Sequence, residues 1–426
     1  MKWILAFAIA CLIMMTGTDL KAQDTTRVYL QDLVNQLIAN NPQLQSMKFD
    51  QKSAEAAIPA AGALPDPVLG LNLMNLPVNS FSMDQEPMTG KQITLMQHFP
   101  FPGKLDIKQD IARKEAAVRQ EKRNEMQNQL IRQLKTVYYD LFYVDQAIET
   151  VRKSKDVIRQ LISVAETKYG VGKGLQQDVL RAQLELSNLM DKEISLRQKR
   201  LTLASKLNTL INQPPEQPVG MIPEPVLQPV VYTLQQFKEQ ADAHSPLLSA
   251  WQTVIDQSDR KVALAQKQLY PDFSVGLAYT QRDRLANGGK GYDFVSAMFS
   301  VNLPIYYKRK QNQQIQEMKL RRSSVEERYQ NVRNSVYQNL QDTYTALQKN
   351  EQLVDLYKNG AIPQAQQSFK SAMSAYQNDK VDFLSLLNSE LSLFHMQLTY
   401  YRALSDYNQN IADLEAATGS SVQTQQ

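Results

Sequence analysis

The chain has 426 residues, with 47 lysines and arginines against 43 aspartates and glutamates, and a formal net charge of +4 at pH 7. So small an excess of positive charge gives no reason to expect a nucleic-acid partner. Three histidines and one cysteine leave no material for a zinc cluster or a disulfide framework. No nucleophile–base pair, phosphate loop or paired-carboxylate site stands out, so we expect no enzyme, no catalytic residue, no cofactor and no resident metal.

The first 22 residues have the order of a secretory signal peptide. Lys2 precedes an apolar run, and a short polar stretch then ends at Ala22, after which we place the cleavage. Cleavage there would remove two basic residues, one acidic residue and Cys11, and would lower the net charge to +3. Acylation at Cys11, as in a lipoprotein, is the alternative. Either way the sequence predicts an exported protein.

Two long helical tracts dominate the chain, from about Lys104 to Lys168 and from about Lys310 to Tyr376. Apolar residues recur in both at steps of three and four, which is typical of amphipathic helices packed against other helices. Each tract ends in a short break and continues as a further helix, so we predict two helical hairpins. Pro363 is expected to kink or break the second tract near Gly360.

The chain is also a tandem duplication. Corresponding motifs recur at an offset of 204–207 residues, for example Leu64-Pro65-Asp66 with Tyr270-Pro271-Asp272 and Phe99-Pro100 with Leu303-Pro304. A stretch rich in proline separates the two copies and is expected to be extended. We therefore divide the chain into a signal peptide (1–22), repeat 1 (23–211), a linker (212–229), repeat 2 (230–417) and a disordered tail (418–426).

Two segments in each repeat alternate between large apolar residues and small or polar ones. We predict strands at about 67–78 and 91–101 in repeat 1 and at about 272–281 and 292–304 in repeat 2, ahead of helical hairpins at 104–211 and 308–417. About ten residues is the length that a tilted strand needs to cross a bilayer. Ordinary hairpins on a soluble coiled-coil protein are the alternative.

Four strands cannot close a barrel by themselves, because the smallest outer-membrane barrels have eight. An open sheet in lipid would leave its edge groups unpaired at a cost of several kcal/mol each. If these strands face lipid, the chain must therefore pool them with other copies, and three copies would give twelve strands. The expected fold class is an α+β membrane protein with a trimeric 12-stranded β-barrel continued by a periplasmic α-helical barrel.

The duplicated plan resembles the TolC-like family of outer-membrane efflux channels over essentially the whole mature chain. The similarity lies in the order of several motifs: Asn41-Pro42 before a helix, Leu64-Pro65-Asp66 before a strand, the run 97–105 between strand and long helix, and the two hairpin turns. The Phe-Pro-Phe-Pro-Gly-Lys run resembles the heavy-metal-cation branch, which exports copper and silver or cobalt, zinc and cadmium. A cluster of methionines with His98 suits Cu(I) in principle, but filler residues facing lipid or the pore are the alternative.

The resemblance implies a homotrimer in the outer membrane, with a large periplasmic portion, that docks onto a periplasmic adaptor (a membrane fusion protein) and an inner-membrane RND-type pump. It also makes the hairpin turns the gated, adaptor-facing end. The candidate residues there are Gly170, Gly172, Gly174, Asp178, Asn378, Asp379 and Lys380. A plain helix-hairpin turn is the alternative for the turn residues, and a surface carboxylate near a helix N-terminus is the alternative for Asp178. Because repeat 2 has no glycine in its turn, we do not expect an identical contact at both turns.

The expected function is the passive outer-membrane channel of a tripartite efflux system, with heavy-metal cations as the expected cargo. A channel for type I secretion or drug efflux is the first alternative, because selectivity lies largely in the pump. A soluble periplasmic coiled-coil scaffold or adaptor is the alternative of another class. It would need the four alternating segments to exist without lipid.

Overall fold

The structure, a computed structural model, describes residues 27–422. The predicted signal peptide, Cys11 and the last residues of the predicted tail (423–426) lie outside this part of the chain. The chain divides into two compact units, and each unit combines segments from both sequence repeats. The spatial units therefore do not coincide with the repeats, and the duplication instead supplies matched parts to each unit.

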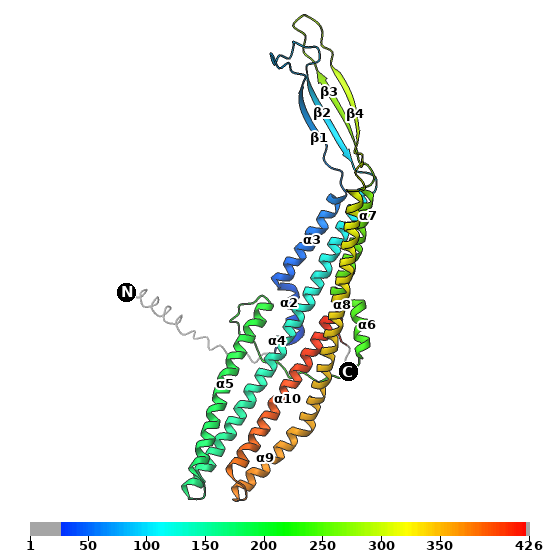
Figure 1. Cartoon of the computed structure of the whole chain (residues 1–426). Helices are drawn as coiled ribbons and strands as arrows, with labels where there is room; N and C mark the ends of the chain where they lie inside the picture. Colours follow the sequence, from blue (N-terminus) through cyan, green and yellow to red (C-terminus); the bar gives the residue numbers. More distant parts are fainter. Residues whose placement is uncertain (1–26, 423–426) are drawn as a thin grey trace, which may run out of the picture. The chain divides into compact units, whose positions relative to one another are not determined.

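Of the described residues, unit 1 comprises 27–40, Gln133–Pro229 and Leu347–Gln409. It holds α2 (Leu30–Asn40), the greater part of α4 (Lys104–Gly170), α5 (Gln176–Leu210), α9 (Ile362–Gln377) and the greater part of α10 (Phe383–Thr418). Figure 1 shows α4 turning into α5 and α9 turning into α10, so both predicted hairpins form. Helix α4 contacts α5 and α10: Arg200 of α5 donates to Asp145 at 2.6 Å, and Ser405 of α10 donates to the Tyr139 carbonyl at 2.8 Å.

The core of unit 1 follows the apolar stripe of α4. Leu134, Leu141 and Val144, which the period of three and four singled out, are fully buried. Val151 and Ile158 continue the same stripe toward the turn and are also fully buried. A helix of 67 residues is thus held by one continuous apolar face rather than by its own propensity.

Of the described residues, unit 2 comprises Asn41–Arg132, Val230–Ala346 and 410–422. Its helices are α3 (Pro42–Gly62), α6 (Leu234–His244), α7 (Pro246–Lys267), the start of α4 and most of α8 (Gln311–Leu356). Proline occupies the first turn of both α3 and α7, where its missing N–H costs nothing. The repeats differ in the cap: Asn41 accepts from the amide of Gln43 at 2.9 Å, whereas Ser245 makes no such side-chain bond.

One antiparallel sheet of unit 2 contains all four strands in the order β1-β2-β3-β4. The strands are β1 (Val68–Met74), β2 (Gly90–Phe99), β3 (Phe273–Gln281) and β4 (Phe294–Val301). β1 is shorter than the predicted range 67–78, because Asn75 adopts a φ of 52° and ends the strand. Strands β2 and β3, one from each repeat, pair in the centre, and β1 and β4 are the edges (Figure 1).

The register places all odd-numbered strand residues on one face of the sheet. That face carries large apolar side chains that are widely exposed: Leu71 is 76% exposed and Phe299 is 70% exposed. The even-numbered face carries small or polar residues such as Gly276, Ser296 and Thr94. The predicted alternation is thus present across the whole sheet, with its apolar side uncovered within this chain.

Helix α8 does not run unbroken into α9. A π-helical segment, Tyr357–Ala361, lies between them and contains Gly360, and Pro363 lies in the first turn of α9. The disturbance lies where it was predicted, but the chain stays helical through a wider turn instead of breaking, and in this turn the Ile362 amide donates to the Tyr357 carbonyl five residues earlier.

Within residues 27–422, none of the helices combines the length and the apolar character that crossing a membrane requires.

Candidate functional site

The first hairpin turn, between α4 and α5, contains the three candidate glycines, and each has a different role. Gly172 has a φ of +75°, which favours glycine. At Gly174 an added Cβ would lie 3.0 Å from the Tyr169 nitrogen, which is a tight contact with backbone. Gly170 has open space around it and no positive φ. The turn therefore favours glycine at two of the three positions, Gly172 and Gly174.

The second turn, between α9 and α10, achieves the same reversal without glycine. Asp379 takes the left-handed conformation, with a φ of 57°, which aspartate tolerates better than most residues. Asn378 donates to the Ser374 carbonyl of its own helix at 2.8 Å. The side chain of Lys380 makes no hydrogen bond or ion pair with any residue in 27–422.

A lysine that the sequence did not single out joins the two turns. Lys168, near the end of α4, donates to the Asp379 carboxylate and to the Tyr376 carbonyl, and its ammonium lies 4.4 Å from the centre of the Tyr376 ring. The Lys168 side chain is 14% exposed, so the charge is largely enclosed by these partners. The bond from Lys168 lowers the pKa of Asp379 below its usual range.

Tyr376 is the centre of this contact. Its ring is buried and packs edge-on against Phe383 at 5.6 Å, which ties the end of α9 to the start of α10. Burial, and then the charges of Asp178 and Asp379, raise the pKa of Tyr376. Asp178, in the first turn of α5, thus lies close enough to act on this site. The structure brings Lys168, Tyr376 and Asp379 into contact, and the charge of Asp178 acts on Tyr376. Within residues 27–422 the side chains of Asn378 and Lys380, which flank Asp379, make no bond to this group.

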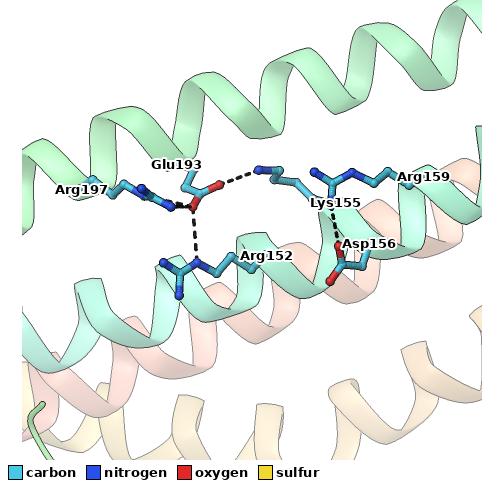
Figure 2. Close-up of polar contacts among 6 residues, drawn as sticks. All are labelled: Arg152, Lys155, Asp156, Arg159, Glu193 and Arg197. Atoms are coloured by element: carbon cyan, nitrogen blue, oxygen red, sulfur yellow. Dashed lines mark hydrogen bonds and ion pairs between the residues drawn. The ribbon is translucent and has the colours of Figure 1, made fainter. Parts of the chain in front are cut away.

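A second cluster of charges joins α4 to α5 farther from the turn (Figure 2). Glu193 of α5 is 6% exposed and accepts from Lys155 at 2.6 Å, from Arg152 at 3.4 Å and from Arg197 at 3.0 Å. The hydrogen bond from Lys155 is the largest favourable cause that lowers the pKa of Glu193 to about 2. One buried carboxylate therefore holds three cations and fixes α5 against α4.

The contact between Lys155 and Glu193 could have been predicted from the hairpin geometry. Residues equally far from a helical turn lie at the same level of the two helices, and Lys155 and Glu193 are each 19 residues from Gly174. In the sequence alone, Glu193 looks like an ordinary i,i+4 partner of Arg197. Among residues 27–422, no group of three or more His, Cys, Asp and Glu side chains is arranged to hold a metal ion.

Comparison with known proteins identifies the family to which this duplicated chain belongs. A family model described as "Outer membrane efflux protein" matches residues 33–213 and 238–420, which covers both repeats. The chain belongs to this outer membrane efflux protein family. An outer-membrane location and an efflux-channel function follow from the membership, and the resemblance to TolC-like channels is confirmed. Membership of this family therefore argues against the alternative of a soluble periplasmic scaffold or adaptor.

Individual relatives are distant in sequence but close in fold. The cobalt-zinc-cadmium resistance protein CzcC of Cupriavidus metallidurans is 22% identical over 288 residues, which is 66% of this chain and 66%, just under two thirds, of that protein. The outer membrane protein VceC of Vibrio cholerae superposes with a TM-score of 0.78 at 18% identity, covering 92% of this chain and 97% of VceC. CusC superposes with a TM-score of 0.77 at 14% identity, covering 92% of each chain. At these identities the solved structures establish the TolC-like fold.

Proposed function

We propose that this efflux protein works as a passive exit duct assembled from three copies. The support is the open sheet: four strands with two free edges, and an exposed apolar face, cannot satisfy their backbone groups in lipid alone. Three copies would supply twelve strands, and the helical hairpins would continue the duct on the periplasmic side. Such a duct performs no chemistry, and the energy for export comes from an inner-membrane partner.

We propose further that the two hairpin turns form the gated end that faces a periplasmic adaptor. The observation that carries this assignment is the contact of Lys168 with Asp379 and Tyr376, since it couples the turn of one repeat to the turn of the other. A gate needs contacts that hold in one state and can be released in another. Charged, partly exposed partners at the ends of the helices meet that need better than a buried apolar core. In this assignment Gly170, Gly172, Gly174, Asp178, Asn378, Asp379 and Lys380 keep their candidate role, and Lys168 and Tyr376 join them.

The proposed cargo is heavy-metal cations, delivered by an RND-type pump through the adaptor. Two observations support it: the match to a protein named for cobalt, zinc and cadmium resistance, and the Phe-Pro-Phe-Pro-Gly-Lys run at 99–104. Export of drugs or secreted polypeptides is the second candidate, because a shared channel fold does not determine which cargo passes through it.

Two experiments test these proposals. A deletion strain is compared with its complemented parent for sensitivity to copper, silver, cobalt, zinc and cadmium and, in parallel, to a panel of drugs. Sensitivity to metals alone supports the cation assignment, and sensitivity to drugs alone overturns it. For the gate, Lys168→Cys with Asp379→Cys is treated with a bifunctional thiol reagent that reducing agents cleave. Export should stop on linking and return on cleavage, whereas unchanged export in linked protein contradicts a gate at this position.

A further inference from the structure

The two repeats meet inside one chain where β2 passes into α4 beside the start of β3. Leu95 of β2 lies opposite Leu277 of β3 in the ladder. Beyond the strand ends, Lys104 donates to the Asp272 carboxylate at 2.7 Å, and the Lys104 side chain is only 8% exposed. The rings of Phe101 and Tyr270 stack 4.6 Å apart beside this ion pair. A ladder, an ion pair and an apolar contact thus define the junction between repeats.

Because the chain is duplicated, counterparts of the four junction residues lie at the two outer edges of the sheet. At an offset of 204, Phe101 corresponds to Ile305 and Lys104 to Lys308, both just after β4. At an offset of 206, Tyr270 corresponds to Leu64 and Asp272 to Asp66, both just before β1. One edge of the chain therefore holds the lysine half of the junction, and the other edge holds the aspartate half.

Among the residues that the structure describes, these outer halves have no partner of the kind found at the internal junction. Asp66 and Lys308 are exposed, and within residues 27–422 neither side chain forms a hydrogen bond or an ion pair. Leu64 is 49% exposed and Ile305 is 69% exposed, although their counterparts Tyr270 and Phe101 stack on each other. Leu64 and Asp66 also border an open surface hollow with Leu105 and Lys108. Opposite charges and apolar groups are thus left at complementary edges.

We infer that β4 of one copy pairs with β1 of a second copy in the register of the internal junction, with Lys308 bound to Asp66 of the partner subunit. The inference rests on the proposed assembly of several copies and specifies how they join. Leu95 of β2 corresponds to Phe299 of β4 at the offset of 204, and Leu277 of β3 corresponds to Leu71 of β1 at the offset of 206. Because Leu95 lies opposite Leu277 in the internal ladder, Phe299 lies opposite Leu71 of the partner subunit. Ile305 then covers the partner's Leu64, as Phe101 covers Tyr270 within the chain.

This register is consistent with the two faces of the sheet. Phe299 and Leu71 both lie on the odd-numbered apolar face, and the same shift sets Val301 opposite Leu69 and Ala297 opposite Leu73. A slip of one residue would turn the apolar side chains of one subunit to the polar face of the other. Both offsets, 204 and 206, are even, so each keeps a residue on the same face of the sheet as its counterpart in the other repeat.

The ion pair is tested by charge reversal in the full-length protein. Asp66→Lys and Lys308→Asp should each lower the trimer fraction in mild detergent roughly tenfold, and the double variant should restore it, because the pair is re-formed with opposite sense. Lys310→Asp is the matched control, since Lys310 is also an exposed lysine and lies two residues away. Rescue of Asp66→Lys by Lys310→Asp, but not by Lys308→Asp, would overturn the assignment.

The register is tested by cysteine pairs linked with a short thiol reagent in membranes. Leu71→Cys with Phe299→Cys should give covalent dimers and trimers, and Leu73→Cys with Phe299→Cys should link much less. Stronger linking of the shifted pair overturns the register while leaving the assembly intact. The mass of the unmodified protein in detergent separates the two proposals: a monomer overturns both, and a trimer whose predicted pair does not link overturns this inference alone.

Discussion

The two hairpins of unit 1 descend from the same repeat but hold together differently. At an offset of 207, the residues that correspond to Lys155 and Glu193 of hairpin 1 are Ile362 and Tyr400 of hairpin 2. The buried ion cluster is therefore present in the α4–α5 hairpin and missing from the α9–α10 hairpin at that level. The π-helical segment Tyr357–Ala361 corresponds to residues 150–154 of α4, so it lies at the same level as the cluster.

A second difference concerns the carboxylates that the hairpins bury. Glu193 is surrounded by cations and stays charged, whereas Glu390 of α10 is 4% exposed and accepts a single bond, from Ser154 of α4 at 3.0 Å. Burial raises the pKa of Glu390, and the bond from Ser154 only partly opposes that shift. Hairpin 1 thus has a buried cluster of charges at this level, whereas hairpin 2 has Ile362, Tyr400 and a wider helical turn there. We expect hairpin 2 to be the one that moves when the gate opens.

The largest expected effect comes from removing the carboxylate that fixes hairpin 1. Glu193→Ala leaves Lys155 enclosed without its partner, and we expect a loss of roughly 3 kcal/mol in the local stability of α5. The measurement is hydrogen exchange of the α4 and α5 amides in detergent. Lys155→Met with Glu193→Leu removes both enclosed charges and should recover most of that protection.

The matched control for this variant lies on α4, next to Lys155. Asp156→Ala breaks the bond of Asp156 to Arg159, which is 2.6 Å long but solvent-exposed (Figure 2). An exposed pair of this kind is worth about 0.5 kcal/mol or less. Equal losses of protection in Glu193→Ala and Asp156→Ala would contradict the view that burial makes the Glu193 cluster the fixed point of hairpin 1.

The turns allow the next comparison, because hairpin 1 uses glycine where hairpin 2 uses aspartate. Gly172→Ala should cost about 1 kcal/mol, because alanine is strained at a φ of +75°. Gly174→Ala should cost at least as much, since its Cβ would press on the Tyr169 backbone 3.0 Å away. Gly170→Ala has open space and serves as the neutral control. Thermal unfolding of the three variants gives the order, and a loss in Gly170→Ala equal to that in Gly172→Ala would contradict this account of the turn.

How far the sequence predicts this molecule depends on whether a feature is local. The strands and hairpins follow from periodicity along the chain, and the duplication follows from repeated motifs such as Tyr270-Pro271-Asp272. The turn glycines could also be predicted, because a turn imposes its needs on the residues that form it. These features require no knowledge of which helices become neighbours.

The contacts of Lys168 could not be predicted in this way. A lysine in the last turn of a helix is ordinary, since it complements the helix dipole, and its partner Asp379 lies 211 residues away. Only the packing of α4 near the turn between α9 and α10 brings the two together. Glu193 is intermediate, because counting outward from Gly174 finds Lys155 once the hairpin is accepted. The sequence therefore predicts which segments form helices, but not which residues of distant helices contact each other.

The contact between the two turns predicts a functional effect rather than a large loss of stability. Lys168→Met keeps the apolar stem of the side chain but removes the bonds to Asp379 and to the Tyr376 carbonyl. We expect the channel to open more often, which single-channel recording in planar bilayers would detect as a higher open fraction. Lys370→Met, which changes an exposed lysine of α9 outside the two turns, is the control and should behave as the parent protein. A Lys168→Met channel that stays as closed as the parent would mean that the contact does not hold the gate.

The smallest expected effect is a pH dependence of opposite sign in the two hairpins. Because the folded-state pKa of Glu193 is depressed to about 2, its contribution to stability is complete above its usual value of 4.5 and is lost only as the pH falls toward 2. Because the folded-state pKa of Glu390 is raised, its contribution is complete below 4.5 and is lost as the pH rises through the raised value. Acidification from neutral pH toward 4.5 should therefore increase the exchange protection of α10 around Glu390, after correction for the intrinsic pH dependence, and leave α5 around Glu193 unchanged.

Glu390→Gln keeps a neutral hydrogen-bonding group at this position and should abolish the dependence in α10. If protection there still varies with pH in the glutamine variant, another group is responsible, and the contrast between the two buried carboxylates fails at this point.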